Sequence, residues 1–414
     1  MGTAEPLARQ SAASARWLSI VGIGEDGTSG LSPAAQALVS GAEIVFGGKR
    51  HLALAAPLIR GAARFWPSPF ERGVEEVLAL RGRQVCVLAS GDPFFHGVGA
   101  VLAAHVDAAE MLVLPSPSAF SLAAARLAWS LPATALLSLH GRDLDLVRPH
   151  LNPRARILAL TSDANGPRAV AKLLAQSGFP RSRLTVLEAL GGPRERVRRT
   201  TAAEFDFADV QDLNTVAIEV IAEEGATIIP RAPGLADEMF EHDGQITKRE
   251  VRAVTLSSLA PRRGELLWDI GAGAGSVAIE WMLCDTSLSA IAIEKHTGRA
   301  ARIRRNAAAL GVPNLQVIEG EAPAALAGLP SPSAIFVGGG ASEVLDAAIA
   351  MLNRGGRLVV NAVTLATERE LLARHAAMGG TLTRIAFARA QALGEETGWR
   401  PAMPITQWIW TKPQ

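Results

Sequence analysis

The sequence predicts a protein of two α/β domains, and three observations lead to this fold class. The chain has 414 residues, which is too many for one ordinary domain. Short apolar runs that resemble buried strands alternate with amphipathic segments, as in sheets covered by helices. One stretch rich in glycine and proline, residues 223–234, interrupts this alternation after a complete strand. We therefore expect a boundary near residues 225–235, between domains at residues 17–224 and 234–414.

The composition of the chain argues against several classes of protein, namely nucleic-acid-binding, membrane and metal-binding proteins. Nearly half of the residues are apolar (49%), and the formal net charge is only +1. These values are typical of soluble α/β domains and give no general attraction to nucleic acid. No apolar run is long enough for a signal peptide or a membrane span, so we expect a cytoplasmic protein that contacts neither membrane nor nucleic acid. Cys86, Cys284 and the eight histidines show no metal-ligand spacing, so no metal site is expected.

Strand and helix signals alternate at the start of the first domain. Ser32 followed by Pro33 indicates a helix start, because serine caps a helix and proline suits its first turn. The expected strands are residues 17–22, 42–46 and 84–89, and further helices are expected over residues 70–81 and 98–106. This order predicts a mostly parallel sheet with ligand-binding loops at the carboxyl ends of its strands.

A second subdomain is expected to begin near Pro117. Its strands are predicted over residues 135–139, 156–161, 183–187 and 215–221. Residues 193–199 form the densest basic run of the chain. Such a run is usually a solvated turn and strand edge, and its alternative role is contact with an anion. The sequence leaves these two interpretations open.

Four short motifs of this first half occur at residues 21–24, 90–94, 115–120 and 139–143. Their order and spacing resemble the tetrapyrrole (corrin/porphyrin) methylase family, over residues 17–222. In that family, S-adenosylmethionine (SAM) lies folded between two α/β subdomains. The resemblance therefore implies a two-subdomain tetrapyrrole methylase fold. The cofactor-binding residues that it implies are Gly22, Gly24, Gly91, Asp92, Ser116, Ser118, Ala119 and His140.

The second half is organised around residues 266–275, an apolar run followed by glycines at alternate positions. Gly271, Gly273 and Gly275 lack Cβ atoms, so the backbone can turn sharply and lie close to a ligand. A second strand ends at Glu294, whose carboxylate could accept hydrogen bonds from both ribose hydroxyls of an adenosine. The glycine spacing differs from the dinucleotide fingerprint and resembles the SAM site of Rossmann-like methyltransferases. The alternative is a glycine-rich turn of another α/β protein.

The cofactor-binding residues expected in this half are Thr247, Asp269, Gly271, Ala272, Gly273, Ala274, Gly275, Glu294, Glu321 and Ala322. Thr247, with Glu250 three residues later, also predicts a capping box that opens a helix ending before Pro261. Basic residues follow in its first turns, where free amide donors already favour anions: Lys248, Arg249 and Arg252. The expected substrate contacts are His242, Lys248 and Arg249. Surface or capping roles are the alternative for these three.

The remaining strands predict a seven-stranded sheet. After residues 266–270 and 290–294 they are expected over residues 314–319, 334–340, 357–361, 382–388 and 405–410. The last two are expected to be antiparallel, as a C-terminal hairpin. Residues 337–342 contain three glycines, which would give a flat surface able to admit a broad macrocycle.

Motifs at residues 243–250, 269–275, 321–323, 337–340 and 361–365 together resemble the decarboxylating precorrin methyltransferase domain, over residues 234–413. The second domain is thus expected to have a Rossmann-like SAM-dependent methyltransferase fold. Together the two resemblances imply methylation of precorrin-6B at C5 by the first domain and at C15 by the second, in cobalamin biosynthesis. They also imply loss of carbon dioxide from the C12 acetate in the second domain. A homo-oligomer is expected, and no general acid or base is assigned.

Two alternatives come from other classes of protein. An RNA methyltransferase is one, since both folds host RNA enzymes, but the chain lacks an overall basic field. A non-catalytic SAM-binding regulator is the other, and it would not need two intact sites.

Overall fold

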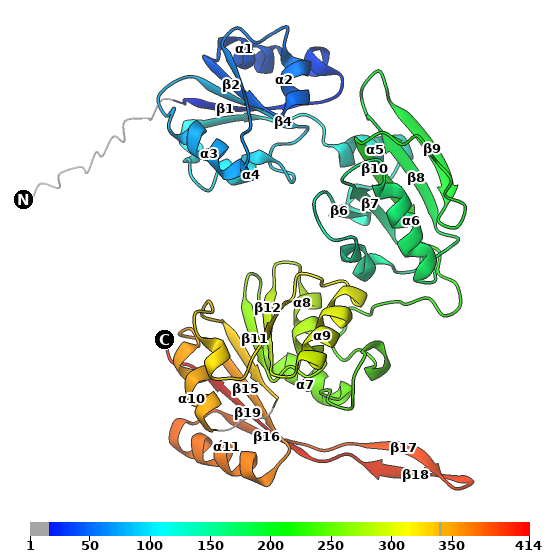
Figure 1. Ribbon diagram of the computed structural model, residues 1–414, viewed down its shortest axis with the longest axis vertical. Helices are drawn as coiled ribbons and strands as arrows, with labels where there is room; N and C mark the ends of the chain where they lie inside the picture. Colours follow the sequence, from blue (N-terminus) through cyan, green and yellow to red (C-terminus); the bar gives the residue numbers. More distant parts are fainter. Residues whose placement is uncertain (1–15, 339–341) are drawn as a thin grey trace, which may run out of the picture. The chain divides into compact units, whose positions relative to one another are not determined.

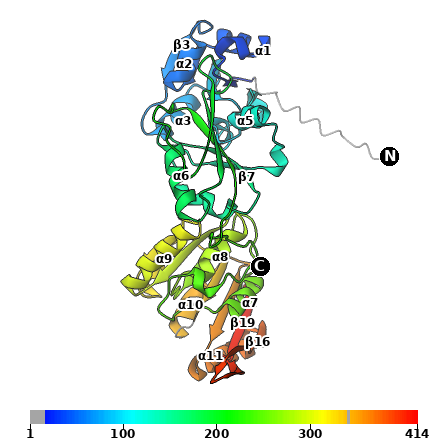
Figure 2. The ribbon, with the colours of Figure 1, turned by 90° about the vertical axis from the view of Figure 1, so that its right-hand side faces the viewer.

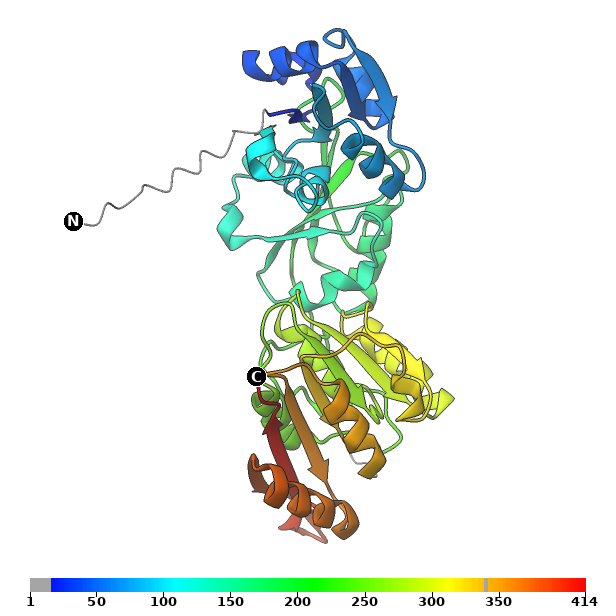
Figure 3. The same cartoon turned by 90° about the vertical axis from the view of Figure 1, so that its left-hand side faces the viewer.

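The computed structural model describes residues 16–338 and 342–414 and divides the chain into two compact units. Unit 1 holds the residues up to 142 and residues 153–226, and unit 2 holds residues 143–152 and 227–414. Figure 1 labels their elements, and Figures 2 and 3 show them from two further sides. No helix in the described part of the chain has the length and apolar character that crossing a membrane requires. Short 3₁₀ helices occur in both units: η1 (Gly27–Gly30), η2 (Ala108–Glu110), η3 (Leu131–Ala133), η4 (Leu144–His150), η5 (Asp237–Met239) and η6 (Ala324–Leu326).

The first subdomain of unit 1 is a parallel five-stranded sheet with the order β3-β2-β4-β1-β5. Its strands are β1 (Leu18–Ile23), β2 (Ile44–Gly47), β3 (Ala62–Phe65), β4 (Val85–Ser90) and β5 (Met111–Leu114). Its helices are α1 (Pro33–Gly41), α2 (Lys49–Ala55), α3 (Phe70–Leu78) and α4 (Val98–Leu102). Apolar clusters lie on both faces of the sheet, which explains why β1 is buried along its whole length. The predicted mostly parallel sheet is confirmed.

Several details of this subdomain differ from the expectation. The sequence did not predict α2, β3 or β5, because each is a short segment without a clear period. The helices expected over residues 70–81 and 98–106 end at Leu78 and Leu102. The residues that follow continue as hydrogen-bonded turns, since the amide of Arg81 donates to Leu78 and that of Val106 donates to Leu102.

The second subdomain has a five-stranded sheet with the order β6-β7-β10-β8-β9, in which β6 and β7 are parallel and the other pairs antiparallel. Its strands are β6 (Ala135–Ser138), β7 (Arg156–Leu160), β8 (Arg183–Glu188), β9 (Arg196–Thr201) and β10 (Asn214–Glu219). Its helices are α5 (Ala119–Leu127) and α6 (Gly166–Gln176). Four strands match the predicted ones. The fifth, β9, is an edge strand formed by the end of the basic run.

Unit 2 contains a seven-stranded sheet with the order β13-β12-β11-β14-β15-β19-β16. Its strands are β11 (Leu266–Ile270), β12 (Ser289–Glu294), β13 (Gln316–Glu319), β14 (Ala334–Val337), β15 (Arg357–Ala362), β16 (Thr381–Ile385) and β19 (Ile405–Thr411). Its helices are α7 (Arg249–Leu259), α8 (Ser276–Cys284), α9 (Thr297–Ala309), α10 (Ser342–Met351) and α11 (Leu365–Met378). Alternate side chains of the strands enter two apolar clusters, around Trp281 on the α8 face and Trp268 on the α10 face (Figure 1). The seven-strand sheet and its antiparallel end, where β19 pairs with β15 and β16, are confirmed.

A further hairpin joins β16 to β19, so the expectation of a simple C-terminal hairpin is wrong. Its strands are β17 (Ala388–Leu393) and β18 (Glu396–Pro401), which pair only with each other among the described strands. We call this hairpin the arm, and Figure 1 shows that it projects beyond the end of the large sheet. Nothing in its polar and weakly alternating sequence distinguishes it from a loop.

Candidate active sites

Three loops of unit 1 meet near the carboxyl ends of β1, β4 and β5. A Cβ atom added at Gly22 would lie 1.8 Å from the carbonyl oxygen of Gly91 and 2.6 Å from the amide nitrogen of Ser116. The amide of Ser116 donates to the Gly91 carbonyl (3.0 Å), and its hydroxyl donates to the Gly22 carbonyl (2.8 Å). Only glycine at position 22 permits this approach. We call these three residues the glycine junction, and it lies where open α/β sheets bind ligands.

Two other predicted residues of unit 1 shape loops beside the junction. Asp92 accepts a hydrogen bond from the amide of Phe94 (2.9 Å), which closes the turn after Gly91. Gly24 follows β1, and a Cβ atom added there would lie 2.7 Å from a carboxylate oxygen of Asp26. Their contacts with a cofactor stay predictions.

The remaining predicted residues of unit 1 belong to the second subdomain. The Ser118 hydroxyl caps α5 by accepting from the amide of Ser121 (3.1 Å), and Ala119 is the first residue of that helix. Ser118 also borders the junction, because a Cβ atom on Gly91 would lie 2.9 Å from its Cα. His140 is exposed after β6, and no described hydrogen bond joins it to the junction. The structure thus places Ser118 at the junction, and the contact of His140 with a cofactor stays a prediction.

Unit 2 has a cavity of about 1130 Å³ at the carboxyl ends of its parallel strands. This volume can hold an adenosine-sized cofactor and part of a larger ligand. The predicted residues that line it are Thr247, Lys248, Gly271, Ala272, Gly273, Glu294, Glu321 and Ala322. The predicted residues that do not line it are His242, Arg249, Asp269, Ala274 and Gly275.

The glycine loop of unit 2 forms one wall of this cavity. Gly271 and Gly273 have φ angles of +72° and +61°, in the left-handed region that favours glycine. The amides of Gly271 and Ala272 both donate to the Ile293 carbonyl, at 2.9 and 3.1 Å. The loop is therefore bonded to the end of the neighbouring strand β12.

Glu294 ends β12 and is almost completely buried. One carboxylate oxygen accepts from the amide of Gly273 (2.9 Å), and the other accepts from the amide of His296 (3.0 Å). Each oxygen has a second lone pair that can face the cavity. Glu294 therefore braces the glycine loop, and its contact with a ribose stays a prediction.

Asp269 lies beneath the cavity, not in its wall. One of its carboxylate oxygens accepts from the amide of Ala278 (3.0 Å), near the start of α8. The other is buried and has no hydrogen-bond partner among the described residues. Burial, with a smaller contribution from the charge of Glu294, raises the pKa of Asp269 to about 7. Its position fits a role in holding the loop against α8.

Asn306, on α9, is a support residue that sequence reasoning missed. Its side-chain nitrogen donates to the carbonyls of Ala274 and Glu241, both at 2.9 Å, and its oxygen accepts from the Glu241 amide (2.8 Å). It therefore fastens the glycine loop to the segment before α7. A buried asparagine in an amphipathic helix was the available signal.

The predicted capping box at Thr247 is wrong. The helix α7 begins at Arg249, its N-cap is Lys248, and no side chain caps it. Glu250 cannot reach back to complete a box, because its carboxylate pairs with Arg389 of the arm (2.6 Å). Thr247 instead lines the cavity one residue before the cap.

Arg252 is not available to a substrate, contrary to the expectation. Its guanidinium is fully buried and forms ion pairs with Glu280 and with Asp237 (3.2 Å). It also donates to the carbonyls of Leu235 and Thr247. Because Thr247 lines the cavity, this buried network fixes the segment that closes one side of the site.

Of the three predicted substrate contacts, Lys248 is the one that lines the cavity. The His242 ring accepts a hydrogen bond from the amide of Gly244 (3.1 Å), which stabilises a turn. Arg249 is exposed outside the cavity. Gly338, after β14, lines the cavity, while the glycines expected to extend a flat surface, residues 339 and 340, lie outside the described residues.

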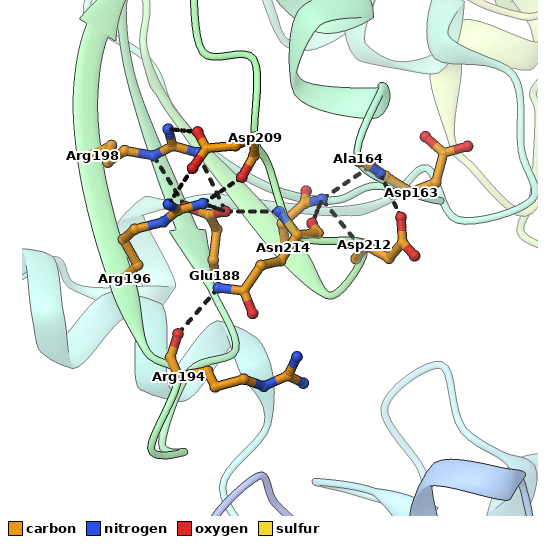
Figure 4. Close-up of polar contacts among 10 residues, drawn as sticks. Asp163, Ala164, Glu188, Arg194, Arg196, Arg198, Asp209, Asp212 and Asn214 are labelled. Carbon is orange, nitrogen blue, oxygen red and sulfur yellow. Dashed lines mark hydrogen bonds and ion pairs between the residues drawn. The ribbon is translucent and has the colours of Figure 1, made fainter.

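Two arginines of the basic run of unit 1, Arg196 and Arg198, form internal ion pairs (Figure 4). Arg196 and Arg198 each pair with buried Glu188 (2.8 and 3.1 Å) and with Asp209 (2.7 Å for both). Hydrogen bonds from Arg196 and then Arg198 lower the pKa of Asp209 to about 2. The charges of these two arginines therefore serve the edge strand β9. Among the described residues, no group of histidines, cysteines and carboxylates could hold a metal ion.

Comparisons with known proteins agree with both expected resemblances. Residues 18–206 match the family described as Tetrapyrrole (Corrin/Porphyrin) Methylases, and residues 238–412 match the family described as Precorrin methyltransferase domain. The precorrin-6Y C(5,15)-methyltransferase [decarboxylating] of Sinorhizobium sp is 62% identical to this chain over 398 residues, which cover 96% of each protein.

Two shorter relatives each correspond to part of the chain. A probable cobalt-precorrin-6B C(15)-methyltransferase (decarboxylating) of Saccharolobus solfataricus is 38% identical over 148 residues, 34% of this chain and 74% of that protein. The cobalt-precorrin-7 C(5)-methyltransferase of Salmonella typhimurium is 30% identical over 203 residues, 49% of this chain and 98% of that protein. The match over nearly the whole length, together with the two domain matches, shows that the chain belongs to the family of decarboxylating precorrin-6Y C(5,15)-methyltransferases.

Proposed function

We propose that this chain uses SAM to methylate a precorrin at C5 and C15 and removes carbon dioxide from the C12 acetate side chain, in cobalamin biosynthesis. The observation that carries the proposal is the presence of two candidate sites at strand ends, the glycine junction of unit 1 and the cavity of unit 2. The substrate is precorrin-6Y in the name of the full-length relative and cobalt-precorrin-6B in that of the C15 relative. Both names attach decarboxylation to the reaction.

The residues present fit the cofactor in both units. When bound, SAM supplies an electrophilic methyl group on its sulfonium. In unit 2, the carboxylate of Glu294 suits ribose hydroxyls, and Gly271 and Gly273 keep side chains away from the ligand. In unit 1, the absence of side chains at Gly22 and Gly91 lets three loops pack together at the carboxyl ends of the strands, where open α/β sheets bind ligands.

We assign C5 to unit 1 and C15 with decarboxylation to unit 2. The match to the C5 relative covers 203 residues of this chain. The segment 227–414 is shorter than that, so this match must include part of unit 1. The match to the C15 relative covers 148 residues, which the segment 227–414 can hold. In the names of these relatives the C15 enzyme acts on a precorrin numbered 6B and the C5 enzyme acts on one numbered 7. We therefore place methylation at C15 before methylation at C5.

Little covalent machinery is needed for these steps. A meso carbon of a reduced tetrapyrrole is already nucleophilic, so the protein must align it with the sulfonium methyl and exclude water. The conjugated ring can accept the electron pair that remains after carbon dioxide leaves, and a proton then completes the methyl group. Lys248 lines the unit 2 cavity and is the proposed contact for a peripheral carboxylate, and contacts of His242 and Arg249 with the substrate are proposed from the sequence alone.

The test is to incubate the full chain with SAM and either the reduced tetrapyrrole or RNA. The tetrapyrrole should gain two methyl groups and lose one carbon dioxide, and RNA should gain no methyl. Isothermal titration calorimetry should find two equivalents of SAM per chain. A single equivalent, or binding without methyl transfer, would contradict the proposal, and the latter would favour a regulator.

We also propose that the chain is a homo-oligomer joined through the arm, in the cytoplasm. An isolated two-stranded hairpin is marginal in water, and the arm exposes Trp399 (77%) and Leu393 (75%). Sedimentation of the wild type and of Trp399→Ser provides the test. A monomeric wild type at micromolar concentration would contradict this part of the proposal.

A further inference from the structure

A polar cluster lies beside the glycine junction, and none of its residues is among the predicted cofactor or substrate contacts, although Ser90 begins the motif at residues 90–94 and Arg194 belongs to the basic run. Arg50 and His51 come from α2, after the carboxyl end of β2, and Ser90 is the last residue of β4. The Ser90 hydroxyl lies 2.7 Å from Nη2 of Arg50 and 2.8 Å from Nε2 of His51. The other terminal nitrogen of Arg50 pairs with Glu25, in the loop after β1. With Arg194, described below, we call these residues the Arg50 cluster.

The hydrogen bonds assign a role to His51. Nη2 of Arg50 also lies 3.0 Å from Nε2 of His51, and arginine can only donate, so Nε2 must accept. The ring hydrogen is then on Nδ1, which is buried and has no partner among the described residues. Burial and the charge of Arg50 lower the pKa of His51 to about 4, so the ring is neutral near pH 7. His51 therefore orients Arg50 and Ser90 without adding charge.

The second subdomain closes the other side of the cluster. Gly192 packs on Glu25, because a Cβ atom added at Gly192 would lie 2.5 Å from the Glu25 Cβ. Nη2 of Arg194 lies 3.8 Å from Glu25, and the Arg194 side chain is 71% exposed. Figure 4 shows that this side chain points away from the ion pairs of Arg196 and Arg198. One arginine from each subdomain thus faces a single carboxylate, which leaves the cluster with a net positive charge.

The strand order separates this cluster from the glycine junction. Ser90 directly precedes Gly91, and β4 lies between β1 and β2 in the sheet. The junction is on the β1 side of β4, whereas Arg50 follows β2 on the other side and its guanidinium reaches across to Glu25 after β1. A ligand at Arg50 would therefore lie on the β2 side of a cofactor held at the junction, and methyl transfer needs its two reactants held next to each other.

We propose that the Arg50 cluster binds a peripheral carboxylate of the tetrapyrrole and so presents the ring for methylation at C5. This inference rests on the proposed function of unit 1. Arg50 and Arg194 bind the carboxylate by charge-assisted hydrogen bonds, which are the strong ones in proteins. Ser90 is a further contact, and His51 is a positioning residue that acts through Arg50 and Ser90.

The decisive variant of the full chain is the double substitution Glu25→Gln with Arg50→Gln. Arg50→Gln alone would leave the nearly buried Glu25 without its main partner, whereas the double variant removes both charges together. The product should stall after one methyl is gained and one carbon dioxide lost. The KM for the C5 step should rise roughly 10- to 100-fold, as expected for a lost charge-assisted hydrogen bond. Two equivalents of SAM should still bind with wild-type affinity.

Three further variants sharpen this test. Glu25→Gln alone should lower the KM for the tetrapyrrole, because it frees Arg50 for the ligand. His51→Leu should raise that KM, and His51→Gln, which keeps an acceptor, should restore it. The matched control is Arg83→Gln, which breaks an exposed pair with Glu43 at the other end of β4 and should leave both methylations unchanged.

Two results would overturn the inference. One is a double variant that forms the doubly methylated product at the wild-type KM. The other is a loss of SAM affinity equal to the rise in KM, since the cluster would then bind the carboxylate of SAM itself. If the wild type transfers no methyl to the tetrapyrrole, the proposed function fails, and this result is distinct from failure of the variants alone.

Discussion

The two units hold their candidate cofactor sites in different ways. In unit 1, backbone atoms of Gly22, Gly91 and Ser116 touch directly, and the site depends on the absence of a side chain. In unit 2, the site is a cavity whose wall is fastened by the buried pair of Arg252 and Glu280. Unit 1 should therefore be sensitive to added volume, and unit 2 should be sensitive to lost charge. Substitutions that add volume in unit 1 or remove a charge in unit 2 therefore test this difference between the units.

The largest effect is expected from Gly22→Ala. The added methyl group would overlap the Gly91 carbonyl, so the loops must separate and the glycine junction is lost. We expect C5 methylation to be abolished, while C15 methylation and decarboxylation continue in unit 2. Mass spectrometry of the product measures both. The matched control is Gly41→Ala at the end of α1, where no atom lies within 4 Å of the added Cβ; equal activity of the two variants would refute the prediction.

The second effect is on the stability of unit 2. Arg252→Met leaves the buried carboxylate of Glu280 without its cation and that of Asp237 with Arg389 alone, which should cost about 3–5 kcal/mol of the free energy of unfolding. Urea unfolding followed by tryptophan fluorescence measures this loss. Arg389→Met is the control, because its pairs with Glu250 and Asp237 are partly exposed and should contribute about 1 kcal/mol or less. If both variants lose a similar free energy of unfolding, then burial does not make the Arg252 ion pairs more important for stability than the exposed ones.

The same contrast explains what the sequence could predict. The sequence predicts Gly271, Gly273 and Glu294 as neighbours at one site, and they line one cavity, because strand, glycines and Glu294 follow one another within about one βαβ unit. Gly22, Gly91 and Ser116 were placed together through a family resemblance, since nothing local links residues so far apart. The strand periods likewise predicted the seven-stranded sheet of unit 2 and the parallel sheet of unit 1.

What could not be predicted depends on tertiary contacts. Arg50 and Ser90 are 40 residues apart and meet only because β2 and β4 are neighbours in the sheet. Thr247 was assigned as a cap on its spacing to Glu250, but that carboxylate is held by Arg389, a residue of an arm with no sequence signal. Arg252 lies in the first turns of a helix, where the sequence favours an anion contact, but its side chain is fully buried in the core. Long-range pairing overrode the local pattern in each case.

The third prediction tests the unit 2 cavity by cofactor binding. Glu294→Gln keeps the shape of the side chain but points an amide hydrogen toward the amide of Gly273 or His296. SAM affinity in unit 2 should fall roughly 10- to 100-fold, and the site in unit 1 should be unchanged, so calorimetry should resolve one strong and one weak site. Glu319→Gln is the control, because Glu319 is the register partner of Glu294 on β13 but pairs with Arg304 at the surface. Weakening of both sites together would contradict the assignment.

The smallest effect is a difference in the sign of the pH dependence of the two units. Asp269 of unit 2 has its pKa raised to about 7 from 3.8, so its contribution is complete below about pH 4 and is lost as the pH rises toward 7. His51 of unit 1 has its pKa lowered to about 4 from 6.5, so its contribution is complete above about pH 6.5 and is lost as the pH falls. Each group changes stability by at most about 1.4 kcal/mol per pH unit. Hydrogen exchange of each unit between about pH 4 and 7 should therefore show Asp269→Asn flattening only the slope of unit 2 and His51→Gln only that of unit 1. If these substitutions leave the pH dependence of stability unaltered in both units, then neither buried group changes its protonation on folding. The difference between the units would then depend on packing alone.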